Sequence, residues 1–399
     1  MHSNTDKLDS DYLRLYLPCS LPEGTIRGNG EKPARIAYIG HLLSSRPYDG
    51  NRDYITLNKT RLRETVSYKA TEAAFSTFGG MIEVNHNYTP GVKAKGYRWS
   101  DELRKTGATA QSFYCPRFKE SLKAIRDKVR GEYNPLQRRL DDDLKGIKLE
   151  ISNLPLFINN IPPKQGVKSE SHRRTVIQKT AEDVMSGYRG IITGSETTGR
   201  IHCLPNRLST HLRSELTLHG SDVVEIDLAN SQPFFLATMF ESSSLTDAVT
   251  AGEFYERINV QLATPLDLTD DDARGRFKQD VLSVIYATPN KGVDYTKLST
   301  WKQADTAKAM EAAYSGITAF IDAYRRTHGK TALPIAMQRL ESSVFIDGVL
   351  ATLQTRGIPA IPIHDSVMCR MEDASEVEGL VCDALIGETG LNPIVKRSA

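Results

Sequence analysis

The sequence predicts an α+β protein in which an antiparallel sheet is combined with many helices. A β-branched run at 223–228 and two apolar runs within 357–371, which are separated by His364-Asp365, are typical of strands. An amphipathic stretch at 101–185 and a four-residue repeat at 274–286 indicate helices. Asp227 lies at the end of the first strand candidate, and Asp365 lies at the turn between the other two. Two such carboxylates could meet across one sheet, although each alone is more often a turn or capping residue.

The N-terminal hundred residues predict a small domain. Residues 1–50 are rich in Gly, Pro and Ser and indicate a loosely structured lead-in. Two short helical patterns follow from Asn58, and a Gly79-Gly80 stop leads into a hairpin. Helix, helix and basic hairpin together resemble a winged-helix module, which binds nucleic acid or another protein. The hairpin's candidate nucleic-acid contacts are Lys93, Lys95 and Arg98.

Composition limits the class of protein. At 399 residues with 39% apolar and 25% charged residues, the chain can bury more than one core. The sequence shows neither a bilayer-spanning apolar run nor a leader pattern, so we expect a cytoplasmic protein without a membrane partner. Five widely spaced cysteines without a CxxC pair are typical of reduced thiols and argue against a zinc centre.

The net charge of +2 conceals an asymmetry between the two halves of the chain. Residues 1–220 contain 35 Lys and Arg against 24 Asp and Glu, whereas residues 221–399 contain 16 against 25. A basic half favours contact with a polyanion, and an acidic half can concentrate carboxylates around metal ions. A solvated helical surface explains the basic half equally well.

A helix candidate lies between the two acids. Arg274, Lys278, Leu282 and Tyr286 follow one another at four-residue spacing, which places them along one inclined helix face. Two cations followed by an apolar group and a phenol suit a nucleoside triphosphate. A helix with a solvated face and Leu282 in a core would show the same pattern.

These motifs occur in a recognisable order. Thr198-Gly199-Arg200, Asp227, the helix from Arg274 to Tyr286, Met337-Gln338 and His364-Asp365 resemble family A DNA polymerases and the related single-subunit, phage-type RNA polymerases. The resemblance implies a right-hand fold with an antiparallel palm sheet and helical fingers and thumb. We expect the winged-helix-like domain in 1–100, the basic thumb-like region in 101–220 and the palm in 221–399, with the fingers inserted at about 240–335.

The resemblance also implies roles. Asp227 and Asp365 would be the catalytic residues and would bind Mg²⁺ or Mn²⁺, so that a primer 3′-hydroxyl attacks a nucleoside triphosphate. Nucleotide-binding residues would be Arg274, Lys278, Leu282, Tyr286 and Gln232. Primer-template-binding residues would be Thr198, Arg200, Gln338 and His364. The N-terminal half has neither the length nor the pattern of a proofreading exonuclease, and a chain this short suggests a processivity or initiation partner.

Departures from the family pattern concern the sugar. Ser366 follows His-Asp, as in the RNA enzymes, where DNA enzymes have Glu. Gln232 stands where DNA enzymes have the Glu that excludes a ribose 2′-hydroxyl, and it keeps the bulk without the charge. We therefore favour dNTPs. The alternatives are an RNA-synthesising or primase-like enzyme that uses rNTPs, a winged-helix binding protein with an inactive polymerase-like scaffold, and, last, a metal-dependent nuclease.

Overall fold

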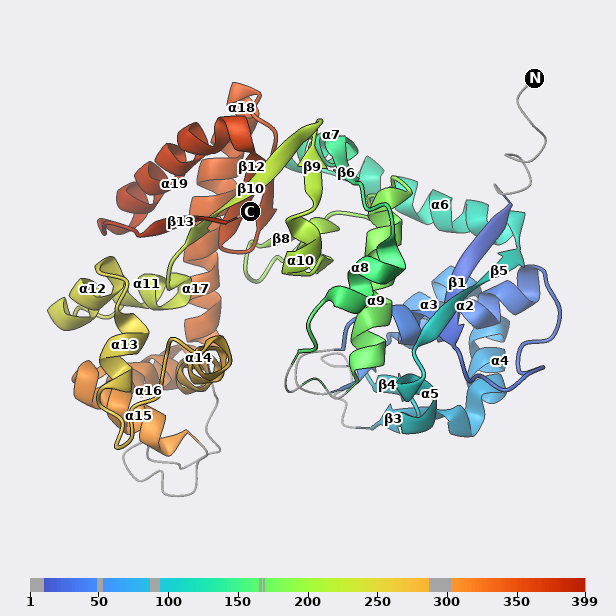
Figure 1. Cartoon of the computed structure of the whole chain (residues 1–399), viewed down its shortest axis with the longest axis horizontal. Coiled ribbons are helices and arrows are strands. Elements are labelled where there is room, and N and C mark those ends of the chain that lie inside the picture. The colour runs from blue at the N-terminus through green and yellow to red at the C-terminus, as the bar shows by residue number, and fades with distance from the viewer. Residues whose placement is uncertain are drawn as a thin grey trace. The chain divides into compact units, whose positions relative to one another are not determined.

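The computed structural model describes residues 11–48, 53–86, 94–164, 167, 169–286 and 303–398 (Figure 1). These residues form both helices and antiparallel strands, which confirms the α+β class. The chain forms two compact units. The first comprises residues 1–134, 149–191 and 207–212, and the second comprises 135–148, 192–206 and 213–399. The region 101–220, expected to be one thumb-like part, contributes to both units. Within the described residues we find no helix long and apolar enough to span a bilayer.

The first unit contains a two-stranded antiparallel ribbon of β1 (Tyr12–Pro18) and β5 (Ala108–Tyr114), with Leu15 opposite Gln111. Residues 101–185 are largely helical, as expected, and β5 is a strand within this region that the sequence analysis did not predict. The segment Ala108–Tyr114 finds its hydrogen-bonding partner in β1, almost a hundred positions earlier, and this pairing overrides the helical pattern around it.

A second group of elements in this unit runs helix, strand, helix, helix, strand, strand. Its members are α2 (Glu31–Ser45), β2 (Ile55–Thr56), α3 (Lys59–Val66), α4 (Tyr68–Phe78), β3 (Ile82–Asn85) and β4 (Gly96–Trp99), and the strands lie in the order β2-β4-β3. Asn58 caps α3 by accepting the N–H groups of Thr60 and Arg61, and Ser67 caps α4. The two helices and two strands expected after Asn58 are therefore present.

The core of the first unit lies where α2 packs against β1 and α4. Gly40 of α2 allows this approach, because a Cβ there would lie 2.8 Å from Leu17 and 3.1 Å from both Phe78 and Trp99. Trp99 is buried and donates its indole N–H to Ser44 at 2.9 Å. The remaining helices of this unit are α5 (Asp101–Lys105), α6 (Pro116–Gly131), α8 (Leu154–Asn160) and α9 (Glu170–Met185).

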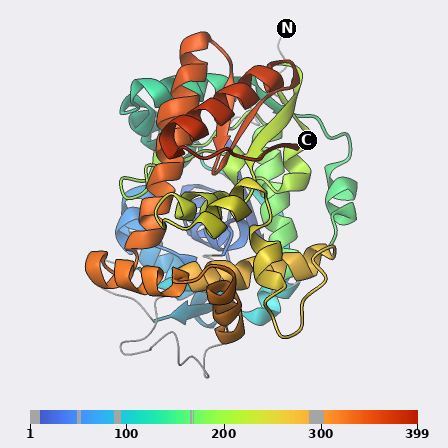
Figure 2. The ribbon, with the colours of Figure 1, turned by 90° about the vertical axis from the view of Figure 1, so that its left-hand side faces the viewer.

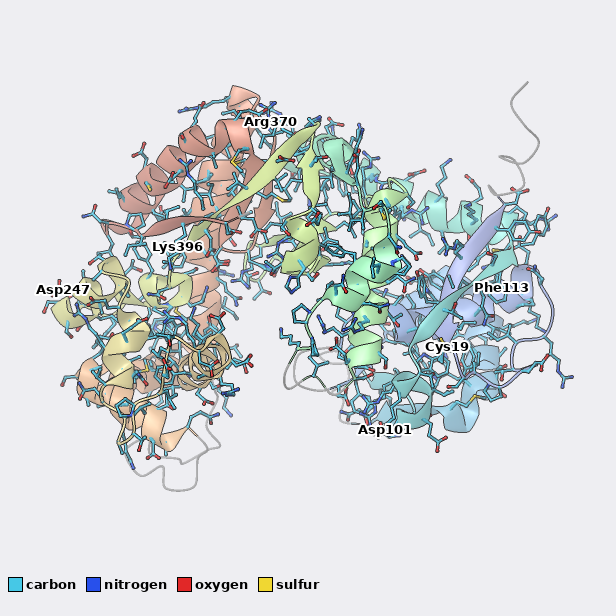
Figure 3. All side chains as sticks on the ribbon, in the orientation of Figure 1. Cys19, Asp101, Phe113, Asp247, Arg370 and Lys396 are labelled. Atoms are coloured by element: carbon cyan, nitrogen blue, oxygen red, sulfur yellow. The ribbon has the colours of Figure 1, made fainter. Side chains whose placement is uncertain are left out.

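The second unit is built on a six-stranded sheet in the order β11-β12-β10-β9-β6, with β13 also paired to β10. Strand β10 (Ser221–Leu228) runs antiparallel to its three partners β9, β12 and β13. The other strands are β6 (Ile147–Leu149), β9 (Leu216–Leu218), β11 (Ala360–Ile363), β12 (Ser366–Arg370) and β13 (Val395–Ser398). Figure 3 labels Arg370, at the end of β12, and Lys396, in β13. Both expected strand regions thus belong to one antiparallel sheet.

Helices connect β10 to β11. They are α11 (Ser231–Ala237), α12 (Ser243–Thr250), α13 (Phe254–Asn259), α14 (Asp271–Tyr286), α15 (Ala304–Ala313), α16 (Ile317–His328) and α17 (Ala332–Ser342). A π-helical stretch, Ser343–Leu350, continues α17 into α18 (Ala351–Arg356), and α19 (Ala374–Thr389) packs against this stretch, as Figure 2 shows in orange and red. Short elements complete this unit: α7 (Pro135–Asp143) and the hairpin of β7 (Thr193–Gly194) and β8 (Ile201–His202), while α10 (Thr210–Arg213) spans the boundary between the units.

Candidate active site

Asp227 and Asp365 lie side by side at one end of the six-stranded sheet. Asp227 is next to last in β10, and Asp365 occupies the two-residue turn between β11 and β12. The register pairs Asp227 with Ser366, the residue after Asp365, and the N–H of Leu228 donates to the carbonyl of Asp365 at 3.4 Å. The tight turn holds His364 at a φ of +55°. The structure therefore brings together the two acids that the sequence places far apart.

The electrostatics of this acid pair suit a bound cation. Burial, followed by repulsion from Asp365 and Glu225, raises the pKa of Asp227 to about 7. Lys278 and Lys396 partly oppose this rise. Carboxylates this close are costly to ionise together unless a cation neutralises them, and hard oxygen ligands are those that Mg²⁺ prefers. The acid pair thus fits Mg²⁺ or Mn²⁺.

Glu225 is a third acid beside the pair, and the sequence analysis did not identify it. It precedes Asp227 by two positions in β10, so both side chains point to the same face of the sheet. Arg213 forms an ion pair with its carboxylate, and the hydroxyl of Ser366 donates to it at 3.4 Å. Among the described residues, no three acidic, histidine or cysteine side chains are clustered as metal ligands. The period-two spacing of Glu225 and Asp227 was the available signal.

Helix α14 presents one polar face. Asp270 caps its first turn by accepting the N–H groups of Asp272 and Ala273. The buried side of the helix carries Phe277, Val281, Val284 and Ile285. Arg274, Lys278, Leu282 and Tyr286 are all partly exposed and lie outside that buried set. The helix expected from the four-residue spacing is therefore present, with these four side chains along a separate face.

The two cations of α14 have partners. Arg274 forms an ion pair with Glu256 at 2.7 Å. The ammonium of Lys278 lies 5.4 Å from the ring centroid of Tyr255. Burial, followed by repulsion from Arg274 and Lys396, lowers the pKa of Lys278. Because Lys278 also acts electrostatically on Asp227, α14 borders the acid pair.

A chain of hydrogen bonds joins Arg200, Glu341, Gln232 and Tyr286, which we call the Glu341 network. Arg200 donates through Nε and Nη2 to the two oxygens of Glu341, each at 2.7 Å. Gln232 donates through Nε2 to Glu341 at 2.6 Å and accepts the hydroxyl of Tyr286 at 2.5 Å. Burial is the main cause that raises the pKa of both Glu341 and Tyr286. Three of the four residues were expected site residues, and Glu341 was not.

The remaining expected primer-template residues surround this network. Thr198 lies in the turn of the β7–β8 hairpin, where Gly199 has a φ of +75° and its Cβ position would be 3.0 Å from Ser342 of α17. Only glycine fits this approach without strain. Gln338 lies on α17, one turn before Glu341. The rings of His364 and His202 are 5.9 Å apart, and burial, helped by Arg200 and His202, lowers the pKa of His364.

The three expected contacts of the basic hairpin lie in the first unit. Lys93 falls outside the described residues. The Nζ atom of Lys95 lies 3.5 Å from Nδ1 of His86. Arg98 forms ion pairs with Asp53, Glu83 and Asp101, and only 14% of its side chain is exposed. Its guanidinium thus holds the β2-β4-β3 sheet to the neighbouring segments.

No protein-family model matches the chain, and no curated protein matches it. Among solved structures, the chain is similar to the POL domain of Pol1 from M. smegmatis in complex with DNA primer-template and dNTP. The TM-score is 0.40 at 12% sequence identity, covering 92% of this chain and 80% of that one.

Proposed function

We propose that this protein is a template-directed nucleotidyltransferase that extends a primer with deoxynucleoside triphosphates. One observation carries the proposal: Asp227 and Asp365 adjoin at the sheet end, with the cationic face of α14 beside them. An acid pair alone would equally serve a nuclease. The cationic helix face adds a place for a polyphosphate, which hydrolysis of a nucleic acid does not require.

In this mechanism Asp227 and Asp365 would hold two divalent ions. When bound, the ions would activate the primer hydroxyl and stabilise charge on the leaving pyrophosphate. Lys278 and Arg274 hold the triphosphate by charge-assisted hydrogen bonds, and Leu282 and Tyr286 pack against its nucleoside. Arg200, Gln338, Thr198 and His364 orient the primer-template end.

Gln232 supports the choice of a deoxynucleotide. Its side chain is fixed between Glu341 and Tyr286, so a bulky polar group stands rigidly beside Tyr286. A group held in this way can collide with a ribose 2′-hydroxyl. Ser366 favours the second candidate, synthesis of RNA by a primase-like enzyme, because phage-type RNA polymerases carry serine after the same His-Asp step.

The first unit supports a role in binding nucleic acid. Its element order from α2 to β4, with β4 central in the sheet, resembles that of winged-helix modules, in which the helix equivalent to α4 contacts DNA. Lys69 is exposed on α4, and Lys95 leads into β4. We propose that this module selects a template, an origin or an initiation partner.

The test is extension of a labelled primer on DNA and RNA templates with dNTPs or rNTPs in Mg²⁺. We expect Asp227→Asn and Asp365→Asn to lower extension by about a thousandfold or more while primer-template binding changes less than about twofold. Asp222→Asn is the matched control, because Asp222 is exposed on the same strand and on its opposite face. Extension that survives in both site variants would contradict the assignment. A wild type inactive under all conditions would favour the nucleic-acid-binding protein with an inactive scaffold.

A further inference from the structure

The carboxylate of Glu341 is the most deeply buried charge in the second unit's candidate site, with only 1% of its side chain exposed. It receives three N–H donors, two from Arg200 and one from Gln232. A buried carboxylate is tolerated only when hydrogen bonds and a countercharge replace its hydration. The arrangement around Glu341 meets both conditions.

The two donor residues and their acceptor come from separate parts of the chain. Arg200 follows the β7–β8 turn, Gln232 lies in the first turn of α11, and Glu341 lies near the end of α17. Through Gln232 the network also reaches Tyr286, the last residue of α14. A single side chain therefore links the hairpin expected to meet the primer end with the helix expected to hold the nucleotide.

Glu341 fixes which way the amide of Gln232 points. A carboxylate only accepts hydrogen bonds, so the Nε2 group of Gln232 must face Glu341. The amide oxygen then faces Tyr286 and accepts its hydroxyl hydrogen. Without the charge on Glu341, the amide could rotate by half a turn and present a donor to Tyr286 instead.

Glu341 also fixes the guanidinium of Arg200. Two parallel bonds through Nε and Nη2 form a planar fork, which holds the group in one orientation. The fork turns the Nη1 edge of Arg200 away from Glu341. This edge can then donate to an acceptor on the primer end.

We propose that Glu341 is a positioning residue that sets the sugar-selective orientation of Gln232 and Tyr286 together with the primer-reading orientation of Arg200. This inference rests on the proposed polymerase function. It also explains why position 232 carries glutamine, since a glutamate there would face the buried Glu341 carboxylate across the 2.6 Å now spanned by a hydrogen bond. The negative charge near the sugar position resides on Glu341 instead.

The test compares Glu341→Gln with the control Glu376→Gln, which removes a carboxylate from an exposed Arg356 ion pair in the same unit. We expect Glu341→Gln to reduce discrimination between dNTPs and rNTPs about tenfold, raise the KM for dNTP and weaken rejection of a mismatched primer end. The control should leave all three unchanged. An active Glu341→Gln variant with wild-type selectivity and KM would overturn the inference while leaving the proposed function intact.

A second measurement does not depend on activity. A double-mutant cycle of thermal or denaturant unfolding pairs Glu341→Gln with Tyr286→Phe, whose side chains are linked by the two hydrogen bonds of Gln232. The two substitutions are expected to show a non-zero coupling energy in the free energy of unfolding if Glu341 holds the network in place. Additive effects would overturn the inference even if the wild type proves inactive, an outcome that would by itself remove only the proposed function.

Discussion

The hydroxyl of Tyr286 donates to the amide oxygen of Gln232 at 2.5 Å, although the two residues are 54 positions apart. This bond ties the last turn of α14 to the first turn of α11, directly after the strand that carries Asp227. The nucleotide-facing helix and the acid-bearing strand are thereby linked through side chains as well as through the chain.

Gln232→Ala removes the group held beside Tyr286. We expect it to increase incorporation of ribonucleotides relative to deoxynucleotides by about tenfold, because the space for a 2′-hydroxyl opens. Competition between the matched dNTP and rNTP measures this ratio. Unchanged selectivity would show that another group reads the sugar.

Gln232→Glu should lower the melting temperature at neutral pH more than Gln232→Ala does, since it places a second carboxylate against Glu341.

Lys278→Ala should raise the KM for the nucleotide by about tenfold or more and leave primer-template binding nearly unchanged, because a charge-assisted contact to the triphosphate is lost. Arg276→Ala is the matched control, as Arg276 is an exposed cation on the same helix. Steady-state kinetics and fluorescence anisotropy separate the two effects. A loss confined to template binding would contradict the role given to α14.

The raised pKa of Asp227 predicts how pH acts on the protein without divalent ions. In the folded protein this carboxyl titrates near pH 7, whereas an unfolded Asp titrates near about pH 4. Between these values the folded state binds the extra proton, so its stability falls as pH rises through this window. Asp227→Asn should remove this fall and raise the melting temperature at about pH 8. Added Mg²⁺ should restore stability in the wild type alone, and its apparent affinity should weaken below about pH 7.

Asp53→Asn tests the ion-pair cluster of the first unit. Asp53 is buried, at a φ of +58°, between the guanidinium groups of Arg98 and Arg104, with Arg104 at 2.6 Å. Asparagine tolerates the same backbone but leaves two poorly hydrated cations short of a countercharge, so we expect a loss of about 3 kcal/mol in the free energy of unfolding. Glu102→Gln, at an exposed position nearby, should change it by less than about 0.5 kcal/mol. Equal effects would assign the cluster no special role.

Local patterns were sufficient to predict the strands and the helix that carry most of the candidate site residues. The β-branched run before Asp227, the apolar runs around Asp365 and the four-residue spacing from Arg274 to Tyr286 each describe an element whose geometry depends on neighbours in the sequence. The helical patterns after Asn58 and the Gly79-Gly80 stop likewise marked α3 and α4. Such patterns predict an element correctly because the interactions that they describe lie within a single strand, turn or helix.

The missed features depend on partners far along the chain. Strand β5 is a strand because β1 pairs with it. Glu341 belongs to the site because it accepts hydrogen bonds from Arg200, which lies 141 positions earlier. Glutamate in a helix is ordinarily a solvated residue, so nothing around position 341 distinguishes it. Glu225 differs, since its spacing from Asp227 was visible but its anchoring by Arg213 was not.

The alternation of segments between the two units limits how this protein can be divided. Residues 135–148 and 192–206 belong to the second unit, although residues 149–191 between them belong to the first. A recombinant fragment starting at residue 221 would therefore lack β6, β9 and Arg200, and with them an edge of the sheet and one end of the Glu341 network. Neither unit can be exchanged between proteins as one continuous block, and both must complete folding from a chain that passes between them repeatedly.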